Sequence, residues 1–335
     1  MAGAPRVVVC LLSFALASIC VAPLHASEDL DSANKISVAD EDYTSLAEAA
    51  ATQELFDICA SDATGKDIRD LIAQGARVNG KLGEGDTVLM VCAESRREGD
   101  VAVLLSAGAD PNDQSLTGGT ALMVAAKVGH VGIVKVLLAA GGNASSTDAF
   151  GNTPLLIAAM NGHASLIPLL SDAGASPNII KSNGRSALMY AVNNGHADAV
   201  RALVKAGADV DAQDARGTSL LITAVAAGQH DAMQALLEAG SRVNAQASGN
   251  VTALHVAAGI GDMHAVRLLI AAGADVSLTT SGGVDAAKVV LSGPQPVTAE
   301  RHAIAALLSS LGGAPLPDAR AAATSDADAD ELQEL

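Results

Sequence analysis

Histidine is the residue of this chain best suited to acid–base catalysis and metal binding, because imidazole titrates near neutral pH and coordinates metals. Among the eight histidines, His130, His163 and His196 stand 33 residues apart, each directly after a glycine. A position that recurs at a fixed interval reflects a repeated need of the scaffold. We therefore expect these three side chains to bond backbone groups. The scattered His230, His264 and His302 are expected to be solvated.

Other patterns that would indicate an enzyme or a metal site are missing. The chain has no recognisable Ser/His/Asp arrangement, glycine-rich phosphate loop or paired carboxylate setting. The C-x-x-C and H-E-x-x-H spacings of metal sites do not occur. The sequence predicts no catalytic residue, no cofactor and no metal. A small-molecule hydrolase is a rival hypothesis that this missing constellation disfavours.

A strict repeat defines the elements that must hold these residues. A threonine or serine recurs every 33 residues, and glycines keep the same interval around it. A fixed period of this length is typical of a solenoid, in which stacked units build one continuous core. The recurring hydroxyl residues are Thr87, Thr120, Thr153, Ser186, Ser219 and Thr252.

One unit shows the local structure to expect. It begins Gly151-Asn152-Thr153-Pro154-Leu155-Leu156-Ile157-Ala158-Ala159 and continues with Gly162-His163, Leu169-Leu170 and Gly174-Ala175. The threonine hydroxyl can cap a helix, and proline suits the first helical position because its nitrogen carries no hydrogen. The first later glycine separates two short helices, and the second suits a left-handed helix stop.

This unit resembles the ankyrin repeat, whose pattern reads G-x-T-P-L-H-x-A-A, then G-H, then L-L-x-x-G-A. The resemblance implies an all-α fold, a solenoid of stacked helix-turn-helix units with projecting β-hairpin loops. The motif histidine survives only as His255, and Arg96 and Asn250 stand at glycine positions. Pro168 falls inside an expected second helix, where proline tends to kink the chain.

The pattern divides the chain into four segments. Residues 45–312 form the array of about eight units, including degenerate caps at both ends. The second cap is expected as two helices, near residues 285–291 and 298–311. Residues 27–44 are expected to be an acidic, disordered linker, and residues 313–335 an acidic, disordered tail.

Residues 1–26 are typical of a secretory signal peptide. Arg6 precedes an apolar run from Val7 to Ala22, and the small residue Ala26 stands before an acidic stretch. An uncleaved membrane anchor is the alternative, but the run is shorter than the roughly 20 residues that span a bilayer. The chain is therefore expected in the secretory pathway, secreted or in a periplasmic or lumenal space, without membrane insertion after cleavage.

Two cysteines remain after cleavage, Cys59 and Cys92, and they occupy one repeated position. Stacked helices lie roughly 8 to 10 Å apart, whereas a disulfide needs Cα atoms within about 7 Å. The sequence therefore predicts two buried free thiols. The formal net charge of −17 disfavours a nucleic-acid partner. The acidic runs at both ends favour solubility, and a specific basic partner is the alternative.

Partner contacts in ankyrin arrays usually lie on the hairpin tips and the exposed side of the first helices, which line a concave face. Phe150 is notable at such a tip because aromatic residues make up only 1% of the chain and are typical of interface hot spots. It could instead fold back on a neighbouring hairpin, and Tyr190 is expected in the core. The candidate contact residues are Lys127, Phe150, Asn152, Met160, Asn183, Arg185, Asn193 and Arg216, with Leu116, Thr117 and Thr218 at related positions.

The sequence thus predicts an exported, monomeric, non-enzymatic scaffold or adaptor that binds a protein partner through the concave face. The alternative is a regulatory or inhibitory subunit of one exported enzyme. Stoichiometric co-purification with an enzyme and a change in its activity would distinguish the alternative.

Overall fold

A computed structural model describes residues 46–60, 67–214, 216–292 and 298–312. All described residues belong to one compact unit. The expected signal peptide, linker and acidic tail lie outside the described residues, as does the junction between the last two helices.

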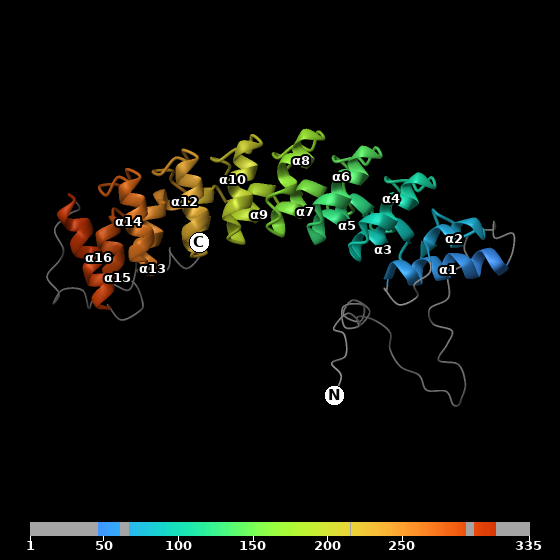
Figure 1. Cartoon of the computed structure of the whole chain (residues 1–335). Coiled ribbons are helices and arrows are strands. Elements are labelled where there is room, and N and C mark those ends of the chain that lie inside the picture. Colours follow the sequence, from blue (N-terminus) through green and yellow to red (C-terminus); the bar gives the residue numbers. More distant parts are fainter. Residues whose placement is uncertain (1–45, 61–66, 215, 293–297, 313–335) are drawn as a thin grey trace, which may run out of the picture. The chain divides into compact units, whose positions relative to one another are not determined.

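Within these residues the chain forms a succession of short helices, most of them paired (Figure 1). One pair of short strands and one 3-10 turn, η2, lie in the connecting loops. The elements are α1 (Leu46–Ala60), α2 (Ile68–Ala73), β1 (Lys81–Leu82), β2 (Asp86–Thr87), α3 (Val88–Glu94), α4 (Glu98–Ser106), α5 (Ala121–Val128), α6 (Val131–Ala139), α7 (Pro154–Met160), α8 (Leu166–Asp172), α9 (Ala187–Asn193), α10 (Ala197–Lys205), α11 (Leu220–Ala226), α12 (His230–Glu238), η2 (Ser248–Asn250), α13 (Ala253–Ile260), α14 (Met263–Ala271), α15 (Ala286–Ser292) and α16 (Ala299–Ser310).

The helices form two layers, as the repeat predicted. The first helices of successive units contact one another from α1 through α3, α5, α7, α9, α11 and α13 to α15. The second helices do the same from α2 to α16 through the even-numbered helices. Each first helix presents alanines that are fully buried, such as Ala125 and Ala158, so neighbours approach closely. A single apolar core therefore runs through the described units.

The repeated hydroxyls begin the first helices, as expected. Each of the six side-chain oxygens accepts a hydrogen bond from the backbone N–H three residues later, at 3.2 to 3.5 Å. Such a bond satisfies one of the unpaired donors at a helix start. At Thr252 the bonding is reciprocal, because its N–H donates to Nδ1 of His255 at 3.2 Å. Burial lowers the pKa of His255, which keeps this acceptor nitrogen unprotonated.

The two positions where another residue replaces glycine keep the glycine conformation. Arg96 has φ 61° and Asn250 has φ 58°, and they are the non-glycine residues with positive φ among those described. Arg96 gains a partner in exchange, since its guanidinium donates to the carbonyl of Val128 in the next unit at 2.8 Å. The repeat thus imposes its backbone geometry even where the residue type is unfavourable.

Pro168 lies nearer the start of its helix than the repeat interval suggests. Helix α8 begins only at Leu166, whereas α6 and α10 begin directly after the histidine of the turn. Pro168 is therefore the third residue of its helix, within the first turn, where a missing N–H removes no intrahelical bond. The late start places the proline where a helix tolerates it.

The prediction of free thiols is wrong. Cys59 of α1 and Cys92 of α3 form a disulfide, and their Cα atoms are 4.6 Å apart. The separation of roughly 8 to 10 Å behind that prediction is a distance between helix axes, whereas the limit for a disulfide applies to Cα atoms. Each Cα lies about 2.3 Å from its own axis, so Cα atoms on facing sides are much closer than the axes themselves.

The histidines of the turns bond backbone groups, as expected. The Nε2 atoms of His163 and His196 bond the carbonyl oxygens of Lys127 and Met160 in the preceding unit, at 2.9 and 3.2 Å. His130 instead caps its own helix, accepting the N–H of Ile133 through Nδ1 at 3.2 Å.

His230 is partly solvated, with its side chain 38% exposed, but its Nε2 lies 2.5 Å from a carboxylate oxygen of Asp262 and its ring packs edge-on against His264. His264 itself is exposed. Within the described residues no three acidic, histidine or cysteine side chains gather as metal ligands. None of the described helices is long and apolar enough to cross a membrane.

Candidate interaction surface

Adjacent hairpins are bonded directly through their backbones. The N–H of Leu116 donates to the carbonyl of Glu84 at 2.9 Å, and the N–H of Ala149 donates to that of Thr117 at 2.8 Å. A side chain at Gly118 would come within 3.2 Å of the backbone nitrogen of Ala149, so glycine permits this approach. The first three hairpin tips therefore form a row.

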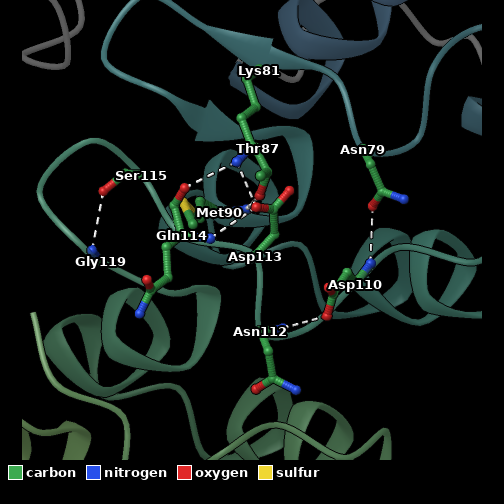
Figure 2. Close-up of polar contacts among 10 residues, drawn as sticks. All are labelled: Asn79, Lys81, Thr87, Met90, Asp110, Asn112, Asp113, Gln114, Ser115 and Gly119. Atoms are coloured by element: carbon green, nitrogen blue, oxygen red, sulfur yellow. Dashed lines mark hydrogen bonds and ion pairs between the residues drawn. The ribbon is translucent and has the colours of Figure 1, made fainter.

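Side chains reinforce the row at the base of each hairpin. Asn79 accepts the N–H of Asp110 at 2.9 Å, and Lys81 pairs with Asp113 and donates to the carbonyl of Gln114 at 3.1 Å (Figure 2). Asn112, Asn178 and Asn244, which lie 33, 99 and 165 residues after Asn79, make the first contact again in later units. A surface built on these loops is therefore held in place before any partner binds.

Most hairpins are closed by one oxygen-bearing side chain at a fixed position. Asp148 accepts the N–H groups of Phe150 and Asn152 at 2.9 and 2.7 Å. Asp214, 66 residues later, accepts the corresponding two N–H groups at 2.9 and 2.8 Å. Ser115 closes its turn in the same way through its hydroxyl. An acceptor at this position satisfies backbone donors of the turn.

Leu82 and Ala247 lack such an oxygen at this position, and the hairpin between α8 and α9 lacks it as well but carries a positive charge there. Lys181 occupies the position of Asp148 and Asp214, and the turn is closed instead by Asn183, which accepts the N–H of Arg185 at 3.2 Å. The ammonium of Lys181 reaches back to the preceding hairpin and donates to Oδ1 of Asn152 at 2.7 Å.

The ring of Tyr190, on α9, is the centre of this cluster. It is half-buried against the core, at a position where neighbouring units carry Val124, Ile157 or Thr223. Lys181 Nζ lies 5.7 Å and Arg185 Cζ lies 5.8 Å from the ring centroid. Both distances fall in the range of cation–π attraction. Tyr190 therefore packs against the core, as expected, but its ring also attracts two cations at the surface.

Asn152, Asn183 and Arg185 of the expected contact set come together in this way. Asn183 donates to the hydroxyl of Tyr190 at 2.9 Å. Asn152 accepts a hydrogen bond from Lys181, whose ammonium lies near the same ring. We call Asn152, Lys181, Asn183, Arg185 and Tyr190 the tyrosine cluster.

Phe150, two residues from Asn152, is 65% exposed. Its side chain therefore does not fold away against a neighbouring hairpin, which was the alternative. It lies on the hairpin that Lys181 joins to the tyrosine cluster.

The remaining expected contact residues lie outside the tyrosine cluster. Met160 is half-buried, and its carbonyl accepts bonds from Asn194 and His196. Asn193 is exposed and donates to its neighbour Asn194 at 3.3 Å. Lys127, on α5, is exposed, and its Nζ lies 3.6 Å from Oε1 of Glu94. Arg216 is exposed on the hairpin between α10 and α11, at the repeat position that Phe150 occupies two units earlier.

Sequence reasoning missed Lys181 and Ile180 and misjudged Tyr190. Ile180 is 65% exposed and stands where other units have Lys81, Gln114 or Gln213. All three residues depart from what their neighbours carry at the same repeat position. That departure was visible in the sequence and could have identified them.

Among the described residues, Lys181 and Arg185 lack the carboxylate partner that several other cations of the array have. Lys81, Arg201 and Arg242 each pair with a carboxylate. In the part of the chain that the structure describes, no carboxylate lies within ion-pair distance of either Lys181 or Arg185. The tyrosine cluster therefore presents two positive charges on a strongly acidic chain.

Comparison with known proteins agrees with this architecture. A family model described as ankyrin repeats (3 copies) matches residues 55–148, 122–214 and 206–280. The crystal structure of the human ASB11 ankyrin repeat domain is similar, with 24% identity and a TM-score of 0.59 over 69% of this chain and 100% of that one. This identity supports the fold alone. The comparison with curated proteins gave no match.

Repeats of this kind generally mediate binding between proteins, which fits a rigid row of hairpins with a chemically distinct centre. Matched segments extend over most of the array, and the six capped helices keep the family's interval. The chain belongs to the ankyrin-repeat family.

Proposed function

We propose that this protein is an exported, non-enzymatic scaffold or adaptor that recognises a protein partner through the hairpins and first helices in the middle of its array. The observation that carries the proposal is the exposed Phe150 beside the tyrosine cluster. In ankyrin arrays this side forms the concave binding face.

The composition of this surface suits recognition. Aromatic and arginine side chains supply most of the energy at protein interfaces, especially near the centre. Phe150, Tyr190 and Arg185 bring those types together in adjacent units, although the chain has three phenylalanines and two tyrosines in all. The hairpin of Phe150 is bonded to the preceding hairpin through its backbone and to the next one through Lys181, so little order is lost on binding.

Alanine substitution in this surface tests the proposal. Once crosslinking has identified a partner, Phe150→Ala and Arg185→Ala are each expected to weaken its affinity by about 2 kcal/mol, or roughly thirtyfold, in a titration of purified proteins. The melting curve should hardly move, because both side chains are exposed. Lys135→Ala, an exposed change on the second-helix layer, serves as the control and should alter neither quantity.

One result would contradict the proposed binding surface. If the combined Phe150, Arg185 and Arg216 alanine variant still captures the partner, and deletion of the residues after Leu316 abolishes capture, the hairpin surface is not the binding element. The acidic tail would then take that role.

Export is the second part of the proposal. Disulfides persist mainly in oxidising compartments, and the bond between Cys59 and Cys92 supports such a destination. Intact-mass analysis of the protein purified from its native source is expected to show a chain that lacks residues up to about Ala26. A full-length chain recovered from the cytosol would refute export.

A further inference from the structure

We propose that Lys181, Arg185 and Tyr190 form a binding site for an acidic segment of the protein partner. This inference rests on the proposed function and names the chemistry that one part of the surface recognises. The partner segment would be extended and would carry carboxylate side chains, with an apolar side chain available to Phe150.

The first argument is the charge reversal at position 181. Asp148 and Asp214 at this repeat position accept two backbone N–H groups each, so the scaffold favours an acceptor there. Lys181 cannot accept a hydrogen bond, and Asn183 closes the turn in its place. Leu82 and Ala247 show that this position tolerates residues without an acceptor, but among such residues Lys181 alone places a charge there. Its ammonium joins the preceding hairpin through Asn152 and is also available to an anion.

The second argument is that Lys181 and Arg185 are held in position and have no carboxylate partner within the described ranges. The ring of Tyr190 attracts both, Asn152 fixes the ammonium, and no described carboxylate pairs with either cation. Arg185 has a planar guanidinium that matches a carboxylate with two parallel bonds. Positioned charges of this kind lose little freedom when an anion arrives.

The third argument concerns the form of the ligand. Both cations lie within 6 Å of one ring centroid. In an extended peptide, side chains on the same face are about 6.6 Å apart. Two carboxylates on alternate residues can therefore reach the two cations from one segment. The net charge of −17 disfavours nucleic acid as the source of the anion.

The test uses fluorescein-labelled hexaglutamate as the probe, with hexaglutamine as its uncharged equivalent. Anisotropy titrations of the mature chain at about 0.05 M ionic strength should show binding of hexaglutamate only, weakening as salt screens the charges. Lys181→Asp should reduce the affinity at least about tenfold. Its melting temperature should not fall, because aspartate is the residue that closes the hairpins at Asp148 and Asp214.

The matched control is Lys205→Asp. Lys205 is exposed at the end of α10, in the second-helix layer, and its replacement changes the net charge by the same amount. Hexaglutamate should bind this variant within about twofold of the unaltered chain. An equal loss in both variants would show that binding follows net charge, and the proposed site would be overturned.

Tyrosine fluorescence reports on the site itself. The chain has two tyrosines and no tryptophan, so Tyr43→Phe leaves Tyr190 as the single emitter. Its emission should change as hexaglutamate saturates the protein and should not change in the Lys181→Asp background. An unchanged emission at saturation would place the peptide elsewhere and overturn the proposal.

Three further outcomes would also overturn it. Equal binding of hexaglutamine would show that charge is irrelevant. Markedly tighter binding of a single-stranded oligonucleotide would indicate a nucleic-acid site. A large gain in hexaglutamate affinity after deletion of the residues following Leu316 would show that the chain's own acidic tail is the occupant.

These results are separable from those on the proposed function. If Phe150→Ala abolishes partner capture while Lys181→Asp leaves hexaglutamate binding intact, the function stands and the acidic-segment site fails. If the peptide results hold but capture survives the triple alanine variant, the site stands and the proposed binding face fails.

Discussion

Truncation of Leu137 to alanine is expected to lower the free energy of unfolding by about 2 to 5 kcal/mol. Leu137 is on α6 and is fully buried, and its helix packs against α4, α8 and α5. Removing its side chain forfeits apolar burial and leaves a cavity that the stacked neighbours close only in part. Urea unfolding followed by circular dichroism measures the change.

Lys135→Ala on the same helix is the control for Leu137. Its side chain is exposed, so the variant should stay within about 0.5 kcal/mol of the unaltered chain. A loss below that value for Leu137→Ala would mean that this face of α6 does not meet the adjacent units, in contradiction to the stacked architecture.

Loss of the disulfide is expected to destabilise the first two units by about 3 to 4 kcal/mol. Cys59 and Cys92 enclose a loop of 33 residues, and closing it restricts the unfolded chain. The effect should be local because each unit contacts only its neighbours. Hydrogen exchange of the α1 amides in a Cys59→Ala/Cys92→Ala variant measures it, with the α9 amides as an internal reference.

Reductant supplies the matched comparison for the disulfide. Added reductant should accelerate exchange at α1 in the unaltered chain and should have no effect on the double alanine variant. Recovery of two free thiols from the unaltered chain under non-reducing conditions would contradict the bond.

The periodic features of the fold could be predicted from the sequence because each unit repeats the same local chemistry. The capping hydroxyls, the turn histidines and the two glycine substitutes Arg96 and Asn250 all lie where the interval places them. Local rules of this kind depend on residues within one turn of helix, and the sequence states them directly.

Two features of the fold do not follow from the repeat interval. The disulfide depends on how closely α1 and α3 approach, which a typical axis separation does not give. The late start of α8 is a local response to Pro168 that the repeat average hides.

The candidate site was predicted only in part for the same reason. Phe150 and Arg185 were identified from their repeat positions alone. The link from Lys181 to Asn152 joins side chains of two hairpins 29 residues apart, so it becomes visible only when the units are stacked.

The covalent bond between the first two units also gives the array a direction. A stack in which each unit contacts only its neighbours loses order from its ends, where a unit has one neighbour instead of two. Cys59 and Cys92 fasten one of those ends. Thermal fraying, or a pull on both termini, would then begin at α16 and proceed toward the amino end. The middle units, which carry the tyrosine cluster, would be reached only after three units on their carboxyl side had been released.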